Sequence, residues 1–571
     1  MLKCAGCQEF LSTARTALLV PHQESPVAPS PSGDSPTVKY PLPLHERNVP
    51  PPRCTSGLNS PAQADPRGTE TEMASRLAAS LALFFLLASV AVLIAVAVVQ
   101  VHKRMYKSAG LRFGIVLDAG SSRTTLYLYQ WPAEKENNTG VVNQTLSCLV
   151  EGPGISSLGL DSIQDQKSWS SLKNCAARAT EAVPSSLHST TPLFLGATAG
   201  MRLLRSENET ASYEILQSLE NYLRSLPFSF RNASIISGAE EGLYGWITAN
   251  YLMGNFLERN LWNVWVHPQG GETIGSMDLG GASTQIAFNT PLDEGVGGEG
   301  YERVRLYGYE YNVYTHSFLC YGKNEAQMRV LAALVRAQKP PSGTVDNPCF
   351  PVDYNTTMSA ANIFGSSCTE QPPNYDPNKQ LLLVGTGDPA GCSAVVRTIF
   401  DLESCHGQAN CSFNGVYQPA LSGGFLAYSG FFYMAKALKL GRSFTLDTFN
   451  STMLAFCSKN WTTLTTNYAI REIYLRSYCF SANYIYTLLV EGYKFTTETW
   501  NNILFQKEVD NSNIAWSLGY MLTLSNMIPA EPKLLWLPMD NSVFAGLLFM
   551  FSSLAILSLM FLIISLVRVC Y

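Results

Sequence analysis

The feature that most constrains this fold is a stretch of sequence that occurs twice. Residues 114–129 read GIVLDAGSSRTTLYLY, and residues 275–288 read GSMDLGGASTQIAF. Each runs from apolar residues into Asp, a small residue and Gly, and then through Ser and Thr back into apolar residues. This order predicts a buried strand, a tight turn and a partner strand. Two such hairpins in one chain predict two related α/β lobes.

The turns of the expected hairpins have the chemistry of a phosphate site. Gly120, Gly280 and Gly281 would let a ligand approach backbone N–H groups closely, and such turns are typical of anion-binding nests. Asp118 and Asp278 would repel a bare phosphate, so they predict a hard divalent cation between carboxylate and phosphate oxygens. One such turn is explained by an ordinary hairpin, but two turns that face each other across a cleft favour a nucleotide site. Hydroxyl donors come from the same turns: Ser121, Ser122, Thr124, Ser283 and Thr284.

Two long apolar segments differ from the pattern of a globular domain. Leu77–Val99 is 23 residues without a charge, and Phe544–Val567 is similar. About 20 apolar residues are enough for a helix to span a membrane. The alternatives are a buried core helix or, for the first segment, a cleaved signal peptide. We expect transmembrane helices at residues 77–101 and 544–567.

The segment between the spans has the features of an exported domain. It contains eight N-x-S/T sequons, and none lies outside it. The sequon asparagines are Asn137, Asn143, Asn208, Asn232, Asn355, Asn410, Asn450 and Asn460. Basic residues after the first span, such as Lys103 and Arg104, favour the opposite orientation under the positive-inside rule. We give the sequons more weight and expect both termini to lie in the cytosol.

Cysteine usage supports the same orientation. Ten of the 14 cysteines lie between the spans, and an even number in an exported region predicts five disulfides. Zinc is the alternative, but no paired CxxC and no HExxH occurs there. The formal charge of −5 comes without a long basic stripe, which argues against nucleic-acid binding.

Local patterns complete the expected organisation. Residues 209–226 place apolar side chains on one helical face before Pro227, residues 191–200 read as a strand entering a turn, and residues 237–256 read as a turn entering a helix. The Pro-, Ser- and Thr-rich N-terminal residues predict disorder. We expect these parts: a cytosolic tail (1–76), a transmembrane helix (77–101), an extracellular domain (102–543) with lobe I (about 108–240 and about 485–535) and lobe II (about 241–484), a transmembrane helix (544–567) and a cytosolic tail (568–571).

The hairpin pattern resembles the actin, heat-shock protein and sugar-kinase superfamily, and no GxxxxGK[ST] P-loop occurs. Five segments in order resemble the five apyrase regions of the ecto-nucleoside triphosphate diphosphohydrolase (ecto-apyrase) family: IVLDAGSSRT, LGATAGMRLL, SGAEEGLYGWITANY, MDLGGASTQ and IAWSLGYML. The resemblance covers about residues 76–568. It implies two actin/heat-shock-protein-like (RNase H-like) lobes with a central cleft, plus one transmembrane helix at each end. Arg123 and SYCFSANYIY look most like one cell-surface subgroup of that family.

The resemblance implies a function. Extracellular nucleotides (ATP, ADP, UTP, UDP) would be hydrolysed stepwise to the monophosphate, with Ca2+ or Mg2+ held through water by Asp118 and Asp278. Glu241 would be the general base, although Glu240 is a rival on sequence grounds, and Gln285 would hold the attacking water. The protein would be a multi-pass protein of the plasma membrane that regulates purinergic signalling.

The resemblance also implies contacts. Phosphate and nucleotide contacts would come from Ser121, Ser122, Arg123, Thr198, Gly281, Ala282, Ser283, Thr284, Gln285 and Tyr433. Arg202 would be either a phosphate clamp or a structural ion pair, the role of Tyr474 stays open, and Trp516 reads as packing. The implied disulfides are Cys148–Cys175, Cys320–Cys368, Cys349–Cys392, Cys405–Cys411 and Cys457–Cys479.

Other functions fit parts of the pattern. A kinase of the same fold would transfer phosphate to a sugar, but extracellular ATP supply is not expected, and Glu241 with Gln285 suits water. A nucleotide receptor without turnover would not need a base. The paired transmembrane helices would also allow a homo-oligomer.

Overall fold

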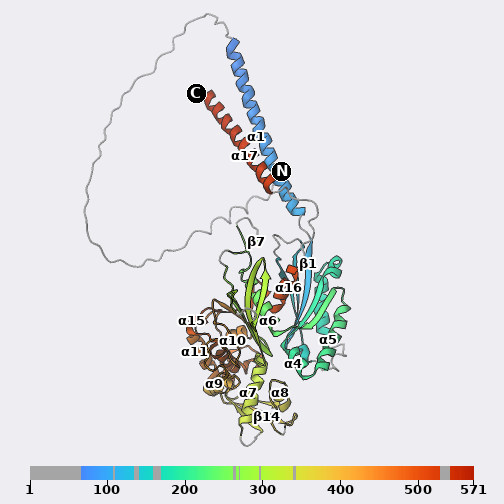
Figure 1. Cartoon of the computed structure of the whole chain (residues 1–571), viewed down its shortest axis with the longest axis vertical. Helices are drawn as coiled ribbons and strands as arrows, with labels where there is room; N and C mark the ends of the chain where they lie inside the picture. The colour runs from blue at the N-terminus through green and yellow to red at the C-terminus, as the bar shows by residue number, and fades with distance from the viewer. Residues whose placement is uncertain are drawn as a thin grey trace, which may run out of the picture. The chain divides into compact units, whose positions relative to one another are not determined.

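The computed structural model describes residues 66–106, 110–133, 140–157, 169–260, 265–268, 271–294, 298–338, 343–373, 375–527 and 541–570. Most of the expected N-terminal tail, sequon Asn137 and the last part of the expected lobe I, residues 528–535, lie outside these ranges. The chain divides into two compact units, residues 1–80 and residues 81–571. In the first unit, the described residues are helical from Pro66 onward. Both lobes belong to the second unit (Figure 1).

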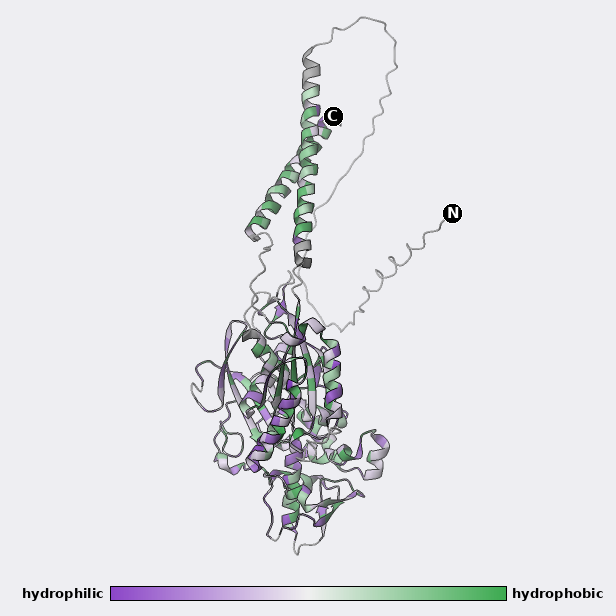
Figure 2. Ribbon diagram, turned by 90° about the vertical axis from the view of Figure 1, so that its right-hand side faces the viewer, coloured by the Kyte–Doolittle hydropathy of each residue, from purple (hydrophilic) through white to green (hydrophobic). Residues whose placement is uncertain are grey.

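Two helices have the length and composition of membrane spans. Within α1 (Pro66–Tyr106) and α17 (Asn541–Cys570), the segments Met73–Gln100 and Ser542–Arg568 are the ones, among the described residues, that could cross a membrane. Figure 2 shows both helices coloured mostly as hydrophobic. Their large side chains are exposed, for example Phe84 at 64% and Phe549 at 77%. A buried core helix would enclose such side chains, so the exposure favours membrane anchoring.

The first lobe is built on a five-stranded sheet. Its strands are β1 (Leu111–Ala119), β2 (Thr124–Pro132), β3 (Asn143–Val150), β4 (Pro192–Ala197) and β5 (Ser229–Ile235), in the order β3-β2-β1-β4-β5. The first two strands form the expected antiparallel hairpin, and β1 runs parallel to β4. The middle of β1 is fully buried because both sides of the sheet are covered. Helices α3 (Ser170–Ala182), α4 (Ala199–Glu207) and α5 (Glu209–Arg224) belong to this lobe, with short helical turns at Ile155–Ser157 and Ser185–Thr190.

The second lobe repeats this topology. Its six strands are β8 (Gly275–Leu279), β9 (Ser283–Thr290), β10 (Tyr301–Leu306), β11 (Tyr309–Leu319), β15 (Phe425–Ser429) and β16 (Ile503–Phe505), in the order β10-β11-β9-β8-β15-β16. Apart from β10, both order and direction match the first sheet, with β8 in the place of β1. The hairpins also share their register, because Ala119 pairs with Thr124 and Leu279 with Thr284. The α/β class with two related lobes is confirmed.

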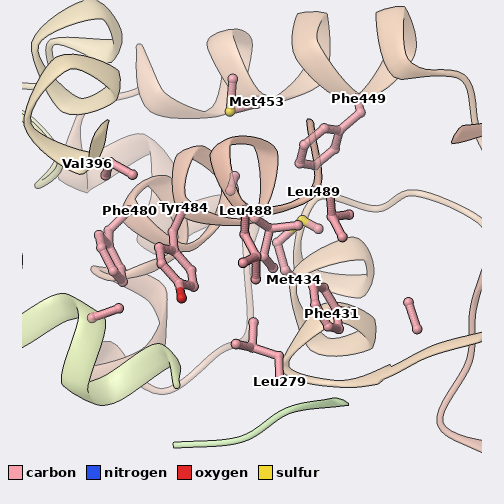
Figure 3. Close-up of a cluster of buried hydrophobic side chains, with 14 of the residues drawn as sticks. Leu279, Val396, Phe431, Met434, Phe449, Met453, Phe480, Tyr484, Leu488 and Leu489 are labelled. Carbon is pink, nitrogen blue, oxygen red and sulfur yellow. The ribbon is translucent and has the colours of Figure 1, made fainter. Parts of the chain in front are cut away.

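Helices of the second lobe enclose its main core. Figure 3 shows apolar side chains from several helices meeting beside Leu279 of β8. These helices are α9 (Pro389–Arg397), α10 (Gly430–Ala437), α11 (Leu446–Cys457), α14 (Tyr478–Tyr486) and the π-helical turn η4 (Thr487–Gly492). Shorter helices are α12 (Trp461–Asn467), α13 (Glu472–Leu475), α15 (Thr497–Trp500) and the turn Glu403–Cys405. An insertion with its own small core comprises α7 (Lys323–Ala337), β12 (Thr344–Asn347), β13 (Asn355–Ser359), α8 (Ala360–Phe364) and β14 (Gln380–Gly385).

Two helices, α6 (Gly238–Leu252) and α16 (Trp516–Met527), pack between the lobes. One core cluster joins Val116 of the first sheet, Trp246 of α6, Val313 of the second sheet and Leu518 of α16. Two small antiparallel ladders, β6 (Glu258–Arg259) with β7 (Trp265–Val266) and β17 (Glu508–Val509) with β18 (Ser512–Asn513), complete the described strands.

The expected lobe boundary at about residue 485 was wrong. We expected lobe I to resume there, but η4 and β16 belong to the second lobe, because β16 pairs with β15 and η4 packs in the second core. The chain returns to the first lobe only near Asn513, whose backbone N–H donates to Gln144 of β3 at 3.1 Å. A three-residue strand such as β16 is too short to show a sequence period.

Five disulfides join cysteines within the described ranges, and they have the pairing that the resemblance implied. The seven sequon asparagines in the described ranges are all exposed. Two of them, Asn208 and Asn460, also cap the N-termini of α5 and α12 through their side-chain oxygens. That use of the oxygen leaves the amide nitrogen, the atom that carries an N-linked glycan, outside the cap.

Candidate active site

The turns of the two hairpins meet. A Cβ placed on Gly281 would lie 2.2 Å from Oγ of Ser122 and 2.7 Å from Oγ of Ser121, so only glycine permits this approach. Asn324 of α7 also donates to Oγ of Ser122 at 3.0 Å. Among the described residues, the backbone N–H groups of the two turns at Ser121, Ser122, Gly281 and Ala282 have no hydrogen-bond partner. Such converging free N–H groups can bind an anion.

Thr198 lies at the edge of this site. It follows β4 and precedes α4, and its N–H donates to the carbonyl of Ala119 at 3.1 Å, next to the first turn. Gly200 of α4 packs against the same turn, because a Cβ there would lie 2.8 Å from Cα of Ser121. The first turn is therefore held rigidly from the side of α4.

The structure separates the two candidate bases at the N-terminus of α6. Glu240 is exposed and forms a capping box with Ser237: its carboxylate accepts from the Ser237 N–H at 2.8 Å, and its own N–H donates to Oγ of Ser237 at 3.1 Å. Glu241 is buried and faces the hairpins. The helix can lie this close to the second sheet because Gly238, Gly242 and Gly245 form one face; a Cβ on Gly242 would lie 2.3 Å from Oγ1 of Thr315.

Glu241 belongs to a buried hydrogen-bond network with the second hairpin. Its Oε2 accepts from Arg202 at 2.8 Å and from Nε2 of Gln285 at 3.0 Å. Nε2 of Gln285 also lies within hydrogen-bond distance of Ser283 Oγ (2.6 Å) and Ser317 Oγ (3.0 Å). Burial raises the pKa of Glu241, and the neighbouring Arg202 guanidinium opposes that rise.

The expected phosphate contact from the Thr284 side chain was wrong. This hydroxyl is fully buried, donates to the carbonyl of Asp278 at 2.7 Å and lies 3.3 Å from the hydroxyl of Tyr493. Alternate residues of a strand face opposite sides of the sheet. Ser283 and Gln285 therefore face Glu241, whereas Thr284 points into the core of the second lobe.

Asp118 and Asp278 occupy equivalent positions at the ends of β1 and β8. Burial, aided by the nearby Glu241 carboxylate, raises the pKa of each to about 7, against 3.8 for an ordinary Asp. Trp516 opposes the rise at Asp118 by donating its indole N–H at 2.8 Å, and Ser429 does so at Asp278. Oδ1 of Asp278 is buried without a hydrogen-bond partner among the described residues.

These aspartates fit a divalent cation. Two partly buried carboxylates that repel a third are stabilised by a positive charge, and Oδ1 of Asp278 is a buried acceptor with no donor among the described residues. Hard oxygen donors suit Ca2+ and Mg2+. No group of three or more His, Cys, Asp or Glu side chains within the described residues could form a complete metal site. The remaining ligands of such an ion would therefore be water and substrate oxygens.

Aromatic side chains lie beyond the first turn. The Arg123 guanidinium lies 5.9 Å from the ring centroid of Tyr433 on α10. Tyr478, at the start of α14, lies near Tyr474 and Tyr433. Its own burial raises the pKa of its hydroxyl, and these two neighbours add to the rise. Tyr474, whose role the sequence left open, is 41% exposed, accepts a hydrogen bond from Arg471 at 2.7 Å and has the Lys323 amine 5.8 Å from its ring centroid. The tyrosines form one patch within reach of the hairpins.

Sequence reasoning missed several residues of this site. Tyr478 lies next to Cys479 in the segment SYCFSANYIY, and nothing in the local sequence pattern indicated that it belongs to the site. Asn324 and Ser317 lie close to the site only through tertiary structure. Trp516 was interpreted as packing; it does pack tightly against Gly196, but it also donates to Asp118. Arg202, left open between clamp and ion pair, is ion-paired with Glu241.

Comparison with known proteins identifies the family. Residues 105–536 match the GDA1/CD39 (nucleoside phosphatase) family. The chain belongs to this family. It is 55% identical over 485 residues to ectonucleoside triphosphate diphosphohydrolase 3 of Homo sapiens, covering 84% of this chain and 91% of that protein. It is 43% identical over 451 residues to ectonucleoside triphosphate diphosphohydrolase 1 of Mus musculus, covering 78% and 87%.

This nucleoside phosphatase also shares its fold with a solved structure. Nucleoside triphosphate hydrolases from Neospora caninum match it with a TM-score of 0.50 and 15% identity over 75% of this chain and 95% of that chain. The family and relatives indicate nucleoside triphosphate diphosphohydrolase activity, so the expected enzyme class is confirmed. The subgroup that Arg123 and SYCFSANYIY indicated is the type 3 member, and that resemblance is confirmed.

Proposed function

We propose that this protein hydrolyses extracellular nucleoside tri- and diphosphates (ATP, ADP, UTP and UDP) stepwise to the monophosphate and phosphate. One observation carries the proposal. Oε1 of Glu241 makes no hydrogen bond to any described residue, and Oε1 of Gln285 is buried without a partner, while Oε2 of Glu241 and Nε2 of Gln285 bond to each other. Oε1 of Glu241 is thus the carboxylate oxygen left to accept a proton from a water molecule, and we assign to Gln285 the role of holding the same water.

The reaction follows from this arrangement. The free N–H groups of both turns, with the hydroxyls of Ser121 and Ser122 and the Arg123 guanidinium, bind the phosphates. The oxygen of the water attacks the terminal phosphorus while Glu241 takes one proton from that water. Gln285 orients the other proton of the water. The bond from phosphorus to the bridging oxygen breaks, and that oxygen leaves with the nucleoside diphosphate when the substrate is a triphosphate, or with the monophosphate when it is a diphosphate. No covalent phosphoenzyme is required, because positioning and charge stabilisation account for most catalysis of phosphoryl transfer.

Asp118 and Asp278 would hold Ca2+ or Mg2+ through bound water. Such an ion neutralises phosphate charge when bound. The protein's own contribution is to bury both carboxylates partly and to fix Asp118 through the indole N–H of Trp516.

The nucleoside would contact the tyrosine patch. Stacking on Tyr433 and Tyr478 tolerates purines and pyrimidines, since every base has a π face. Phosphates held at the turns leave the base on the side of Arg123, which lies near Tyr433. This accounts for a substrate range that includes both ATP and UTP.

We place the enzyme at the plasma membrane, with both lobes outside the cell and a role in purinergic signalling. Five disulfides and seven exposed sequons support an exported domain. Two spans would return both termini to the cytosol.

The test is to express the full chain in cells, add ATP outside with Ca2+ or Mg2+, and follow phosphate, ADP and AMP. We expect phosphate release with accumulation of AMP, lost on chelation. Loss of ATP with phosphate appearing on an added sugar would instead indicate a kinase. Saturable ATP binding at the cell surface without phosphate release would indicate a receptor.

A further inference from the structure

Arg202 joins three separate segments of the site. From α4, its Nη1 donates to the carbonyl of Ile236, just before α6, at 3.0 Å. Its Nη2 donates to Oε2 of Glu241 at 2.8 Å and to Oγ of Ser283 at 3.2 Å. The side chain is 11% exposed. Both terminal nitrogens are therefore engaged with protein groups.

We propose that Arg202 is a positioning residue for the hydrolytic step: it fixes Oε2 of Glu241 so that Oε1 is the atom that accepts the proton of the attacking water. The inference rests on the proposed function. Oε2 already accepts two hydrogen bonds, from Arg202 and Gln285, whereas Oε1 has no partner among the described residues. The two carboxylate oxygens are thus not equivalent, and rotation of the carboxylate would break both bonds.

The same side chain ties the base to both hairpins. Helix α4 is fixed to the first turn through the contact of Gly200 with Ser121, and Arg202 is two residues further along α4. Its bond to Ser283 reaches the second hairpin. The position of Oε1 is therefore set relative to both phosphate-binding turns, as proton transfer during an in-line attack requires.

Electrostatics supports this role. Glu241 lies near two other carboxylates, Asp118 on β1 and Asp278 on β8, and near the buried Tyr428 hydroxyl on β15, which is neutral because its pKa is raised well above its ordinary value. Burial raises the pKa of Glu241, and the Arg202 charge lowers it. Without this cation, the pKa of the Glu241 carboxyl would lie higher still.

A phosphate clamp would behave differently. A clamp contributes to binding of substrate and transition state alike, so its loss raises KM. A residue that aligns the base acts on the chemical step, so its loss lowers kcat. The changes in kcat and KM of an Arg202 variant therefore distinguish a positioning residue from a phosphate clamp.

The test compares Arg202→Met, Arg202→Lys and Arg205→Met in the full-length protein at the cell surface. Arg205 is an exposed arginine of the same helix, which makes it a matched control. We expect Arg202→Met to lower kcat for ATP about 100-fold with KM changed less than about threefold. Arg202→Lys keeps one donor, so we expect it to recover about tenfold of the lost rate, and we expect Arg205→Met to match wild type.

Three results would overturn the inference: a rise in KM at unchanged kcat, a wild-type rate in Arg202→Met, or an equal loss of kcat in Arg205→Met. If Arg202→Met does not reach the surface, Arg202→Lys decides, because a wild-type kcat or a change confined to KM in that variant contradicts a positioning role. A wild type that releases no phosphate would instead refute the proposed function itself.

Discussion

Asp278→Asn should stabilise the metal-free protein while removing its activity. The carboxylate of Asp278 is enclosed near Asp118 and Glu241, and its pKa rises from 3.8 to about 7. A carboxyl with a raised pKa binds its proton more tightly in the folded state than in the unfolded chain. Its ionisation therefore costs stability, and this cost grows from about pH 4 to about pH 7 and then stays constant.

The magnitude follows from that difference. Each pKa unit corresponds to about 1.4 kcal/mol, so a rise from 3.8 to about 7 corresponds to about 4 kcal/mol. The opposing hydrogen bond from Ser429 is already contained in the raised pKa, so it is not subtracted again. We expect a net gain of up to about 4 kcal/mol at pH 8. For a domain of about 400 residues this raises the unfolding midpoint by up to about 5 °C.

The assay is thermal unfolding of the full-length protein in detergent with excess chelator at pH 8 and pH 4. The control is Asp293→Asn, an exposed aspartate in the turn after β9. We expect Asp278→Asn to be more stable than wild type at pH 8, and the difference to disappear at pH 4. Added Ca2+ should stabilise the wild type more than the variant. An unchanged or lower midpoint at pH 8 would refute the reasoning.

Three other predictions follow from single contacts. Glu241→Gln should lower kcat at least about 100-fold, whereas Glu240→Gln keeps the capping box and should retain activity; equal losses measured by phosphate release would contradict the assignment. Gly242→Ala forces a Cβ against Oγ1 of Thr315 and should destabilise the protein by about 1–3 kcal/mol; Thr315→Ala in the same chain should restore most of the unfolding midpoint. Tyr433→Ala should raise KM for ATP and UTP about 5- to 100-fold through lost stacking, while Tyr433→Phe should not, and an unchanged KM in the alanine variant would place the base elsewhere.

Much of the architecture was predictable because the chain repeats itself. The residues around Asp118 and Asp278 have the same order of types, and the two sheets have the same register at those positions. Long apolar runs identified α1 and α17, because a membrane span is defined by about 20 consecutive apolar residues and does not depend on contacts with distant parts of the chain. The family resemblance, not the spacing of cysteines, supplied the disulfide pairing.

Other features depend on contacts that a linear pattern does not carry. The ion pair of Arg202 with Glu241 joins residues 39 positions apart on different helices. Trp516 reaches Asp118 from the far end of the domain, 398 positions away. The orientation of Thr284 could have been found from strand alternation, because its neighbours Ser283 and Gln285 point the other way. The choice of Glu241 over Glu240 required the capping geometry of α6.

The most direct test of the account is a structure of the full-length protein with Ca2+ and a non-hydrolysable ATP analogue. We predict that the phosphates lie between residues 120–123 and 280–283, with the terminal phosphorus nearest to Oε1 of Glu241 and the base on Tyr433. Phosphates bound away from either turn, or a terminal phosphorus beyond the reach of a water held by Glu241 and Gln285, would contradict the account.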